Sequence, residues 1–225
     1  MRVGLLIAIE RELKAFLESE GDLRKEQVNG RTVYRTEIGG NEVFAVMSGY
    51  GEIDAAAGTQ LLITKYGCDA ILNFGVTGAL DPALRVEDLF VVRRVRHYDF
   101  DVSPIDPVRV NQYPGEPDEF MAADEGLISL AKEVCPELRE ATVASGDRFV
   151  EDKALKRKLR EAECGICDME IAAITRVCRL NDVRCLSIKC ISDTYDGDGG
   201  DFEKNVEKSA KKAFEVLKRV IEKMA

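Results

Sequence analysis

Short apolar runs alternate along the chain with longer segments in which apolar residues recur at helical spacing. The near-continuous apolar run from Val3 to Ile9 is typical of a strand that is covered on both faces. Apolar residues of the closing segment recur at the spacing of one helical face, which predicts a final helix. Together the patterns predict strands over 3–9, 32–38, 42–47, 70–74, 89–95, 141–145 and 184–191. They predict helices over 10–18, 53–66, 125–134, 153–162, 169–180 and 202–224.

The order of these elements predicts the fold class. The segment Gly39-Gly40-Asn41 separates two alternating strands, which indicates a β-hairpin. Elsewhere strands alternate with helices, which is the arrangement of an α/β protein. We therefore expect a single domain over residues 1–225, with a mixed central β-sheet flanked by helices. Residues 99–121 contain several prolines, and we expect them to form a long irregular loop of the kind that is often functional.

Composition narrows the class of partner. The 225 residues are 45% hydrophobic, and 32 basic and 41 acidic side chains give a net charge of −9. This length is sufficient for one sizeable core. An acidic chain without a basic block argues against nucleic acid or an anionic membrane as the main partner. The first apolar run is too short to span a membrane and leads directly into charged residues, so we expect neither a signal peptide nor a membrane anchor.

The cysteines and the single histidine bear on redox state and metal binding. Seven cysteines are an odd number for a disulfide framework, and we expect reduced, buried thiols and a cytoplasmic location. Cys164 and Cys167 form a CxxC pair, but the chain has no second ligand pair at the spacing that zinc requires. His97 is the only histidine, which rules out a multi-histidine metal centre. We expect no metal ion and no cofactor.

Four polar or glycine-rich segments share one position in the pattern, because each directly follows a predicted strand. They are residues 10–12, 48–51, 75–78 and 191–193. A doubly wound sheet places its binding crevice at the carboxyl ends of its strands, so we expect these segments to gather around one site. Glycine, serine and aspartate are also ordinary turn residues, which leaves a simple turn as the alternative for each segment taken alone.

Three carboxylates are the candidates for chemistry. Glu12 lies just past the first strand, Glu170 at the start of a helix, and Asp193 just past a late strand. Cleavage of a glycosidic bond needs a base for water, an acid for the leaving group and stabilisation of a cationic sugar. The structural alternatives are a favourable place near a helix terminus for Glu170 and an N-cap or turn for Asp193.

Six segments, in one order along nearly the whole chain, resemble the 5′-methylthioadenosine/S-adenosylhomocysteine nucleosidases of the nucleoside phosphorylase superfamily. They are residues 3–12, Ser48-Gly49-Tyr50-Gly51, residues 73–78, residues 145–149, Met169-Glu170 and Ile191-Ser192-Asp193. The resemblance implies a nucleoside phosphorylase-like fold and hydrolysis of the N-glycosidic bond of adenine nucleosides, with release of adenine. It implies a small-molecule nucleoside as the partner.

The resemblance also assigns roles to residues of this chain. By this likeness, Glu12 activates the attacking water, and Asp193 protonates N7 of the departing adenine with the support of Ser192. Glu170 holds the ribose hydroxyls beside Met169. The remaining contacts with the substrate are expected from Ile9, Ser48, Gly78, Phe149 stacked on the base, and the backbone of Val150. Ile105 and Pro114 are expected in the 5′ pocket, which in this family is completed by a neighbouring subunit, so a homodimer is implied.

Departures from the family pattern leave two questions open. Ile9 stands where methionine is frequent, Lys189 where arginine is common, and Ile105 where an aromatic residue is common, so the preferred 5′ substituent stays open. The closest alternative is a purine nucleoside phosphorylase, for which Arg11 and Arg148 are candidate phosphate ligands. A non-catalytic nucleoside-binding protein on the same fold is the second alternative.

Overall fold

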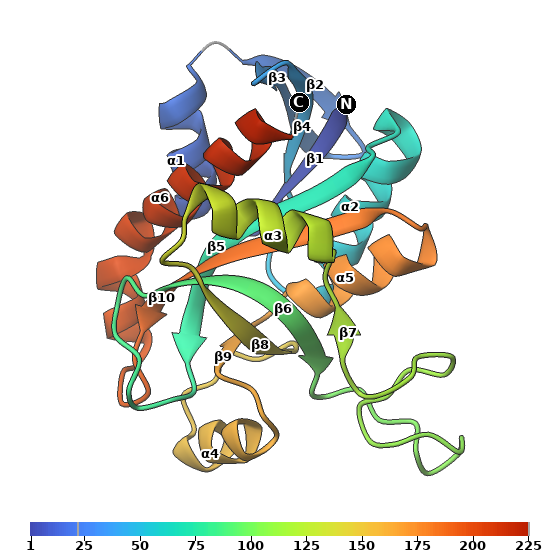
Figure 1. Ribbon diagram of the computed structural model, residues 1–225, viewed down its shortest axis with the longest axis vertical. Helices are drawn as coiled ribbons and strands as arrows, with labels where there is room; N and C mark the ends of the chain where they lie inside the picture. Colours follow the sequence, from blue (N-terminus) through green and yellow to red (C-terminus); the bar gives the residue numbers. More distant parts are fainter. Residues whose placement is uncertain (22, 225) are drawn as a thin grey trace.

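A computed structural model describes residues 1–21 and 23–224, and these form ten strands and six helices (Figure 1). The strands are β1 (Arg2–Ile7), β2 (Arg24–Val28), β3 (Arg31–Ile38), β4 (Asn41–Met47), β5 (Ala70–Ala79), β6 (Leu89–His97), β7 (Met121–Ala122), β8 (Arg139–Ser145), β9 (Ile166–Asp168) and β10 (Arg184–Asp193). The helices are α1 (Glu10–Glu20), α2 (Glu52–Tyr66), α3 (Glu125–Val134), α4 (Lys153–Glu161), α5 (Ile171–Leu180) and α6 (Gly199–Lys223).

All ten strands belong to one mixed sheet. Strands β4, β1, β5 and β10 run parallel and side by side, and the β3–β2 hairpin extends the sheet beyond β4 in antiparallel fashion. On the other side, β5 pairs with β10, β10 with β6, β6 with β8, β8 with β9, and β9 again with β5. The sheet therefore closes on itself at this side, and the long strands β5 and β10 belong both to the open part and to the closed part.

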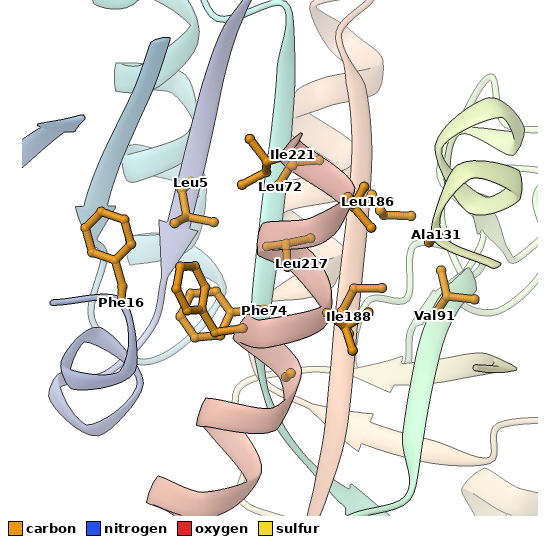
Figure 2. Close-up of a cluster of buried hydrophobic side chains, with 14 of the residues drawn as sticks. Leu5, Phe16, Leu72, Phe74, Val91, Ala131, Leu186, Ile188, Leu217 and Ile221 are labelled. Atoms are coloured by element: carbon orange, nitrogen blue, oxygen red, sulfur yellow. The ribbon is translucent and has the colours of Figure 1, made fainter. Parts of the chain in front are cut away.

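Helices cover both faces of the open part of the sheet, as the sequence pattern predicted. One apolar cluster joins α1, α3 and α6 to one face, and a second joins α2 and α5 to the other. Figure 2 shows α6 lying over β5 and β10, with Leu217 and Ile221 beside Leu72 and Leu186. The architecture is the single α/β domain with a mixed central sheet that the sequence predicted.

Two strands are longer than predicted, which corrects the interpretation of two polar segments. Residues 75–78 continue β5 and residues 192–193 continue β10, so neither segment is a turn after its strand. Backbone pairing explains the extension, since Gly78 lies opposite both Cys167 of β9 and Asp193 of β10. Strand β9 was not predicted because it has only three residues, and β2 was not predicted because its residues are mostly exposed and polar.

The irregular loop predicted over residues 99–121 is present and ends at the short strand β7. Within the part of the chain that the structure describes, no helix combines the length and apolar character needed to cross a membrane.

The hairpin turn between β3 and β4 gives a direct test of how the sheet meets α6. Gly39 has φ +57°, and a Cβ atom there would lie 2.4 Å from Cα of Glu222. Its neighbour Gly40 has φ +77° but open space around it. A left-handed backbone costs a residue with a Cβ about 1–2 kcal/mol, and overpacking adds about 1–3 kcal/mol.

We expect Gly39→Ala to lower the free energy of unfolding by about 2–4 kcal/mol and Gly40→Ala by about 1–2 kcal/mol, on these two costs. Urea denaturation followed by circular dichroism measures both variants. Equal losses in the two variants would show that the backbone of Glu222 does not limit space at this turn.

Candidate active site

One cavity at the carboxyl ends of β1, β5 and β10 brings together the three carboxylates that the sequence singled out. Glu12, Glu170 and Asp193 all line it, although they lie far apart in the sequence. Five further predicted residues also line it, namely Ile9, Gly78, Phe149, Met169 and Ser192. The convergence that the sequence analysis expected at the strand ends is therefore present in the structure.

Glu12 is held by the backbone on two sides. It lies in the first turn of α1 and is only 3% exposed. Its Oε2 accepts hydrogen bonds from the N–H groups of Ala8 (3.2 Å) and Ile9 (3.3 Å), and its Oε1 accepts one from Val76 N–H (2.9 Å). Burial raises the pKa of Glu12, although Lys189 and these N–H groups act in the opposite direction.

Two glycines of β5 make room for two of the carboxylates. A Cβ atom on Gly75 would lie 2.2 Å from Oε1 of Glu12, and one on Gly78 would lie 2.9 Å from Oδ2 of Asp193. Any larger residue at either position would displace a carboxylate from the backbone of β5. The glycines at 75 and 78 are therefore required for close approach, and their role is different from the turn that the sequence suggested.

Glu170 occupies the N-cap position of α5 and is 7% exposed. Its Oε1 accepts a hydrogen bond from the N–H of Gly51 at 3.1 Å, in the segment that follows β4. Burial, together with the nearby charge of Asp168, raises the pKa of Glu170 to about 8. Burial therefore favours the neutral form of this carboxyl more than water would.

Asp193 is the last residue of β10 and is 3% exposed. Its Oδ1 accepts a hydrogen bond of 2.8 Å from the hydroxyl of Ser192. Burial raises the pKa of Asp193, and the Ser192 hydroxyl and Lys156 partly offset this effect. A carboxyl with a raised pKa is suited to carry the proton that a general acid must donate.

A buried ion pair lies behind these three carboxylates and was not predicted. Lys189 of β10 places Nζ 2.7 Å from Oδ2 of Asp168, and both side chains are almost completely buried. Burial alone would lower the pKa of Lys189, but Asp168, Glu170 and Glu12 together raise it. The signal in the sequence was a lysine in the middle of an otherwise apolar strand, where a charge is found only when it is paired.

Glu52 adds a further buried acid close to the site. It lies at the start of α2 and is 6% exposed. Its carboxylate accepts hydrogen bonds from the Ser145 hydroxyl and from Ala173 N–H, both at 2.6 Å. Burial and the charge of Asp168 raise the pKa of Glu52 well above its ordinary value. Acidic groups therefore outnumber the single buried ammonium of Lys189 in this region.

Aromatic side chains form the outer wall of the cavity. Phe149 and Phe202 meet edge to face with ring centroids 5.6 Å apart, and both line the cavity. Tyr50 also lines it and is 67% exposed. Tyr50 and Phe202 had not been predicted as site residues. The wall provides flat apolar surfaces of the kind on which a heteroaromatic ring stacks.

Four predicted site residues do not line the cavity of their own chain. Ser48 is buried beneath the turn after β4, where its hydroxyl lies 3.0 Å from the carbonyl oxygen of Gly49. The Val150 side chain packs in a small apolar cluster beside the site. Ile105 and Pro114 lie exposed in the long loop, and Ile105 is 88% exposed.

The remaining candidates from the sequence lie outside the chemistry of the cavity. His97 contacts the Tyr113 hydroxyl at 2.7 Å and Asp99 at 2.9 Å, which is the satisfied structural histidine that the sequence favoured. All seven cysteines are free and buried, as predicted. Cys167 touches the cavity, but burial raises its pKa far above the range in which a thiolate forms.

The charges that face the cavity are all negative among the described residues. Four carboxylates line it, and no arginine or lysine of residues 1–21 and 23–224 does. Arg11 instead forms an ion pair with Glu203 at 2.6 Å, and Arg148 is exposed. Such a site favours a neutral or cationic ligand and repels a phosphate ion.

This combination of fold and site corresponds to a known protein family. The sequence profile of the phosphorylase superfamily matches residues 2–222. The chain belongs to the phosphorylase superfamily.

Nucleosidases of this superfamily are similar to the chain over its full length. An aminodeoxyfutalosine nucleosidase of Campylobacter jejuni is 30% identical, with both chains fully covered. A 5′-methylthioadenosine/S-adenosylhomocysteine nucleosidase of Hydrogenovibrio crunogenus is 32% identical over 93% of each chain. The crystal structure of the Campylobacter jejuni 5′-methylthioadenosine/S-adenosylhomocysteine nucleosidase superimposes with a TM-score of 0.91 at 30% identity and covers 99% of each chain. The resemblance inferred from the six sequence segments is thereby confirmed.

The Lys189–Asp168 pair of this superfamily member gives a testable consequence for stability. Removing one partner of a buried ion pair leaves an uncompensated charge, which typically costs about 3–5 kcal/mol. We expect Lys189→Met to lower the free energy of unfolding at pH 7 by about that amount. Adding Asp168→Asn should restore part of the loss because it removes the orphaned carboxylate. Chemical denaturation of both variants measures this, and a Lys189→Met protein as stable as wild type would contradict the account.

Proposed function

We propose that this protein hydrolyses the N-glycosidic bond of adenine nucleosides and releases adenine. One observation carries the proposal: Glu12, Glu170 and Asp193 meet in a single cavity that presents carboxylates and aromatic rings but, within residues 1–21 and 23–224, no cation. This combination matches the needs of the reaction, which are a base, an acid, and negative charge near a cationic sugar.

Glu12 acts as the general base. A water molecule attacks C1′ of the sugar and gives its proton to the Glu12 carboxylate. The backbone N–H groups of Ala8, Ile9 and Val76 hold that carboxylate in place, so its oxygens need no reorganisation during the reaction. Its raised pKa strengthens it as a base, because general bases work best near the operating pH.

Asp193 acts as the general acid. When the C1′–N9 bond breaks, its electron pair stays on N9, and transfer of the Asp193 proton to N7 lets adenine leave as a neutral molecule. The hydroxyl of Ser192 fixes the orientation of the carboxyl through its 2.8 Å hydrogen bond. General acid catalysis of this kind typically contributes about 10²–10⁴-fold in rate.

Glu170 binds the ribose hydroxyls beside Met169, and the aromatic wall receives the base. Because the pKa of Glu170 is about 8, its carboxyl can both donate and accept hydrogen bonds at neutral pH. Phe149 stacks on adenine, and the backbone of Val150 forms hydrogen bonds to the edge of the base.

Water, rather than phosphate, is the nucleophile. A phosphorylase needs cations at the crevice, whereas here the carboxylate of Glu12 lines the cavity and neither Arg11 nor Arg148 does. The ammonium of Lys189 is already engaged by Asp168 at 2.7 Å. The carboxylates that line the cavity repel a phosphate ion but not a water molecule, which supports hydrolysis over phosphorolysis.

The 5′ end of the substrate extends towards Ile9 and Tyr50, and we propose that a second copy of the chain completes this end. Ile105 and Pro114 are exposed and apolar, as residues that enter the pocket of a neighbouring subunit would be. The protein is then a homodimer. The relatives described above are named as nucleosidases of aminodeoxyfutalosine and of methylthioadenosine and adenosylhomocysteine, and the last two are the substrates proposed for this chain. Seven free cysteines are consistent with a cytoplasmic location.

Adenine release from a panel of 5′-substituted adenine nucleosides, with and without phosphate, tests the proposal. We expect wild-type protein to release adenine from methylthioadenosine in buffer that lacks phosphate. Asp193→Asn and Glu12→Gln should each lower this turnover by at least about 10²-fold, because each removes a proton-transfer group. Glu18→Gln, an exposed change on the same helix as Glu12, serves as the control.

Two outcomes separate the alternatives. Turnover that stays at background until phosphate is added would replace the hydrolase with a phosphorylase. Protein whose melting temperature rises with adenosine analogues, but which never releases adenine, would be a nucleoside-binding protein.

A further inference from the structure

A buried lysine outside the cavity holds the backbone that follows the general acid. Lys156 of α4 is fully buried, with 0% of its surface exposed. Its Nζ donates hydrogen bonds to the carbonyl oxygens of Thr194 at 3.1 Å and Tyr195 at 3.0 Å, and lies 3.5 Å from that of Gly197. An ammonium group has three protons to donate, so these carbonyl oxygens satisfy it.

This ammonium has no close counter-ion. Among the described residues, no carboxylate lies within 4.0 Å of Lys156 Nζ. A buried charge without a paired charge is costly, and a fold retains one only where it is well hydrogen-bonded or useful. A neutral side chain at this position would avoid that cost. Retention of the charge therefore indicates that Lys156 has a role for the residues that it contacts.

Two further contacts bind the same pair of segments together. Lys153 contacts Asp196 at 2.7 Å, and Glu151 accepts a hydrogen bond of 2.8 Å from Gly199 N–H. Residues 151–156 therefore hold residues 194–199 at three places. The Lys153 and Glu151 contacts are exposed, whereas the Lys156 contact is buried between the segments.

The two segments begin and end at residues of the site. Phe149 lies two residues before the first segment, Asp193 directly precedes the second, and Phe202 lies three residues after the second in α6. A shift of residues 194–197 would move the Asp193 carboxyl relative to the aromatic wall that receives the base. Misplacement of a reacting group by about 1 Å can cost about 10²-fold in rate.

We propose that Lys156 is a positioning residue for the general acid: it fixes residues 194–197 through their carbonyl oxygens and keeps a positive charge behind Asp193. This inference rests on the proposed function, since it assigns Lys156 a role in proton transfer by Asp193. Lys156 does not line the cavity, so it acts on Asp193 from outside it.

The pKa of Asp193 depends on the charge of Lys156 and on groups from every neighbouring element. Burial raises the pKa of Asp193 most, the Ser192 hydroxyl and Lys156 lower it, and Asp201 and Glu151 raise it. Cys167 of β9 also faces Asp193, but burial keeps this thiol neutral by raising its pKa. Lys156 is therefore the one positive charge among these groups that eases release of the Asp193 proton.

Removal of the Lys156 charge changes the pH dependence of kcat. The general acid must be protonated, so activity falls as the pH rises through the pKa of Asp193. Removal of the Lys156 charge raises that pKa, which moves the alkaline limb of the kcat profile to higher pH. The proton also leaves less readily and the carboxyl is less well placed, so kcat at the plateau falls by about 10–100-fold.

The experiment compares Lys156→Met, Lys156→Arg and Lys153→Met in the adenine-release assay with methylthioadenosine, over the pH range in which the folded protein is stable. Lys153→Met is the matched control, because it removes an exposed lysine of the same helix that contacts the same segment. We expect Lys156→Met to lower kcat with little change in KM and to shift the alkaline limb upwards. Lys156→Arg keeps the charge and should keep the limb in its wild-type position, as should Lys153→Met.

Lys156→Met in an Asp193→Asn background separates positioning from general packing. If Lys156 acts through Asp193, the second substitution causes little further loss in the residual rate. A full additional loss in that background, or a wild-type kcat and pH profile in Lys156→Met, overturns the proposal. If Lys156→Met shows no cooperative thermal unfolding transition, Lys156→Gln takes its place in the same assays. Absence of adenine release by wild-type protein would overturn the proposed function instead, before any variant is compared.

Discussion

The active-site region depends on burying several carboxylates around one ammonium group. Lys189 is paired with Asp168, and its charge also acts on Glu12 and Glu170. Burial raises the pKa of Glu12, Glu170 and Asp193. Lys189 and backbone N–H groups limit the rise at Glu12 and Glu170, whereas the Ser192 hydroxyl and Lys156 limit it at Asp193. The result is a site whose acids hold protons closer to neutral pH than free carboxyls do. Proton transfer to and from a nucleoside is the chemistry that such groups perform best.

The sheet makes this concentration of charge possible. Parallel strands β1, β5 and β10 end side by side, so residues far apart in the sequence arrive at one edge. Because Gly75 and Gly78 have no Cβ atom, the carboxylates of Glu12 and Asp193 can lie closer to the backbone of β5 than any larger residue at these positions would permit. Closure of the sheet through β6, β8 and β9 then brings Asp168 and Glu170 to the same edge.

The sequence predicted the helices and most strands because apolar periodicity reports which faces are buried. It also predicted that Glu12, Glu170 and Asp193 meet at one cavity, since polar residues at strand ends and the family resemblance indicated the same positions. It assigned Gly75 and Gly78 to turns, because the pairing of β5 with β9 and β10 is a tertiary contact that local pattern does not contain. The roles of Lys189 and Lys156 also depend on partners distant in sequence. Ile105 and Pro114 stay predictions, because their proposed partner is a second chain.

The central claim is that burial raises the pKa of the proposed general acid, Asp193, above that of a free carboxyl. A ¹³C NMR titration of protein with labelled aspartate side chains measures this directly, with Asp193→Asn used to assign the resonance. The account predicts a titration midpoint for Asp193 clearly above the ordinary value of about 4. A midpoint at or below that value would contradict it, because Asp193 would then be ionised at neutral pH and could not donate a proton to adenine.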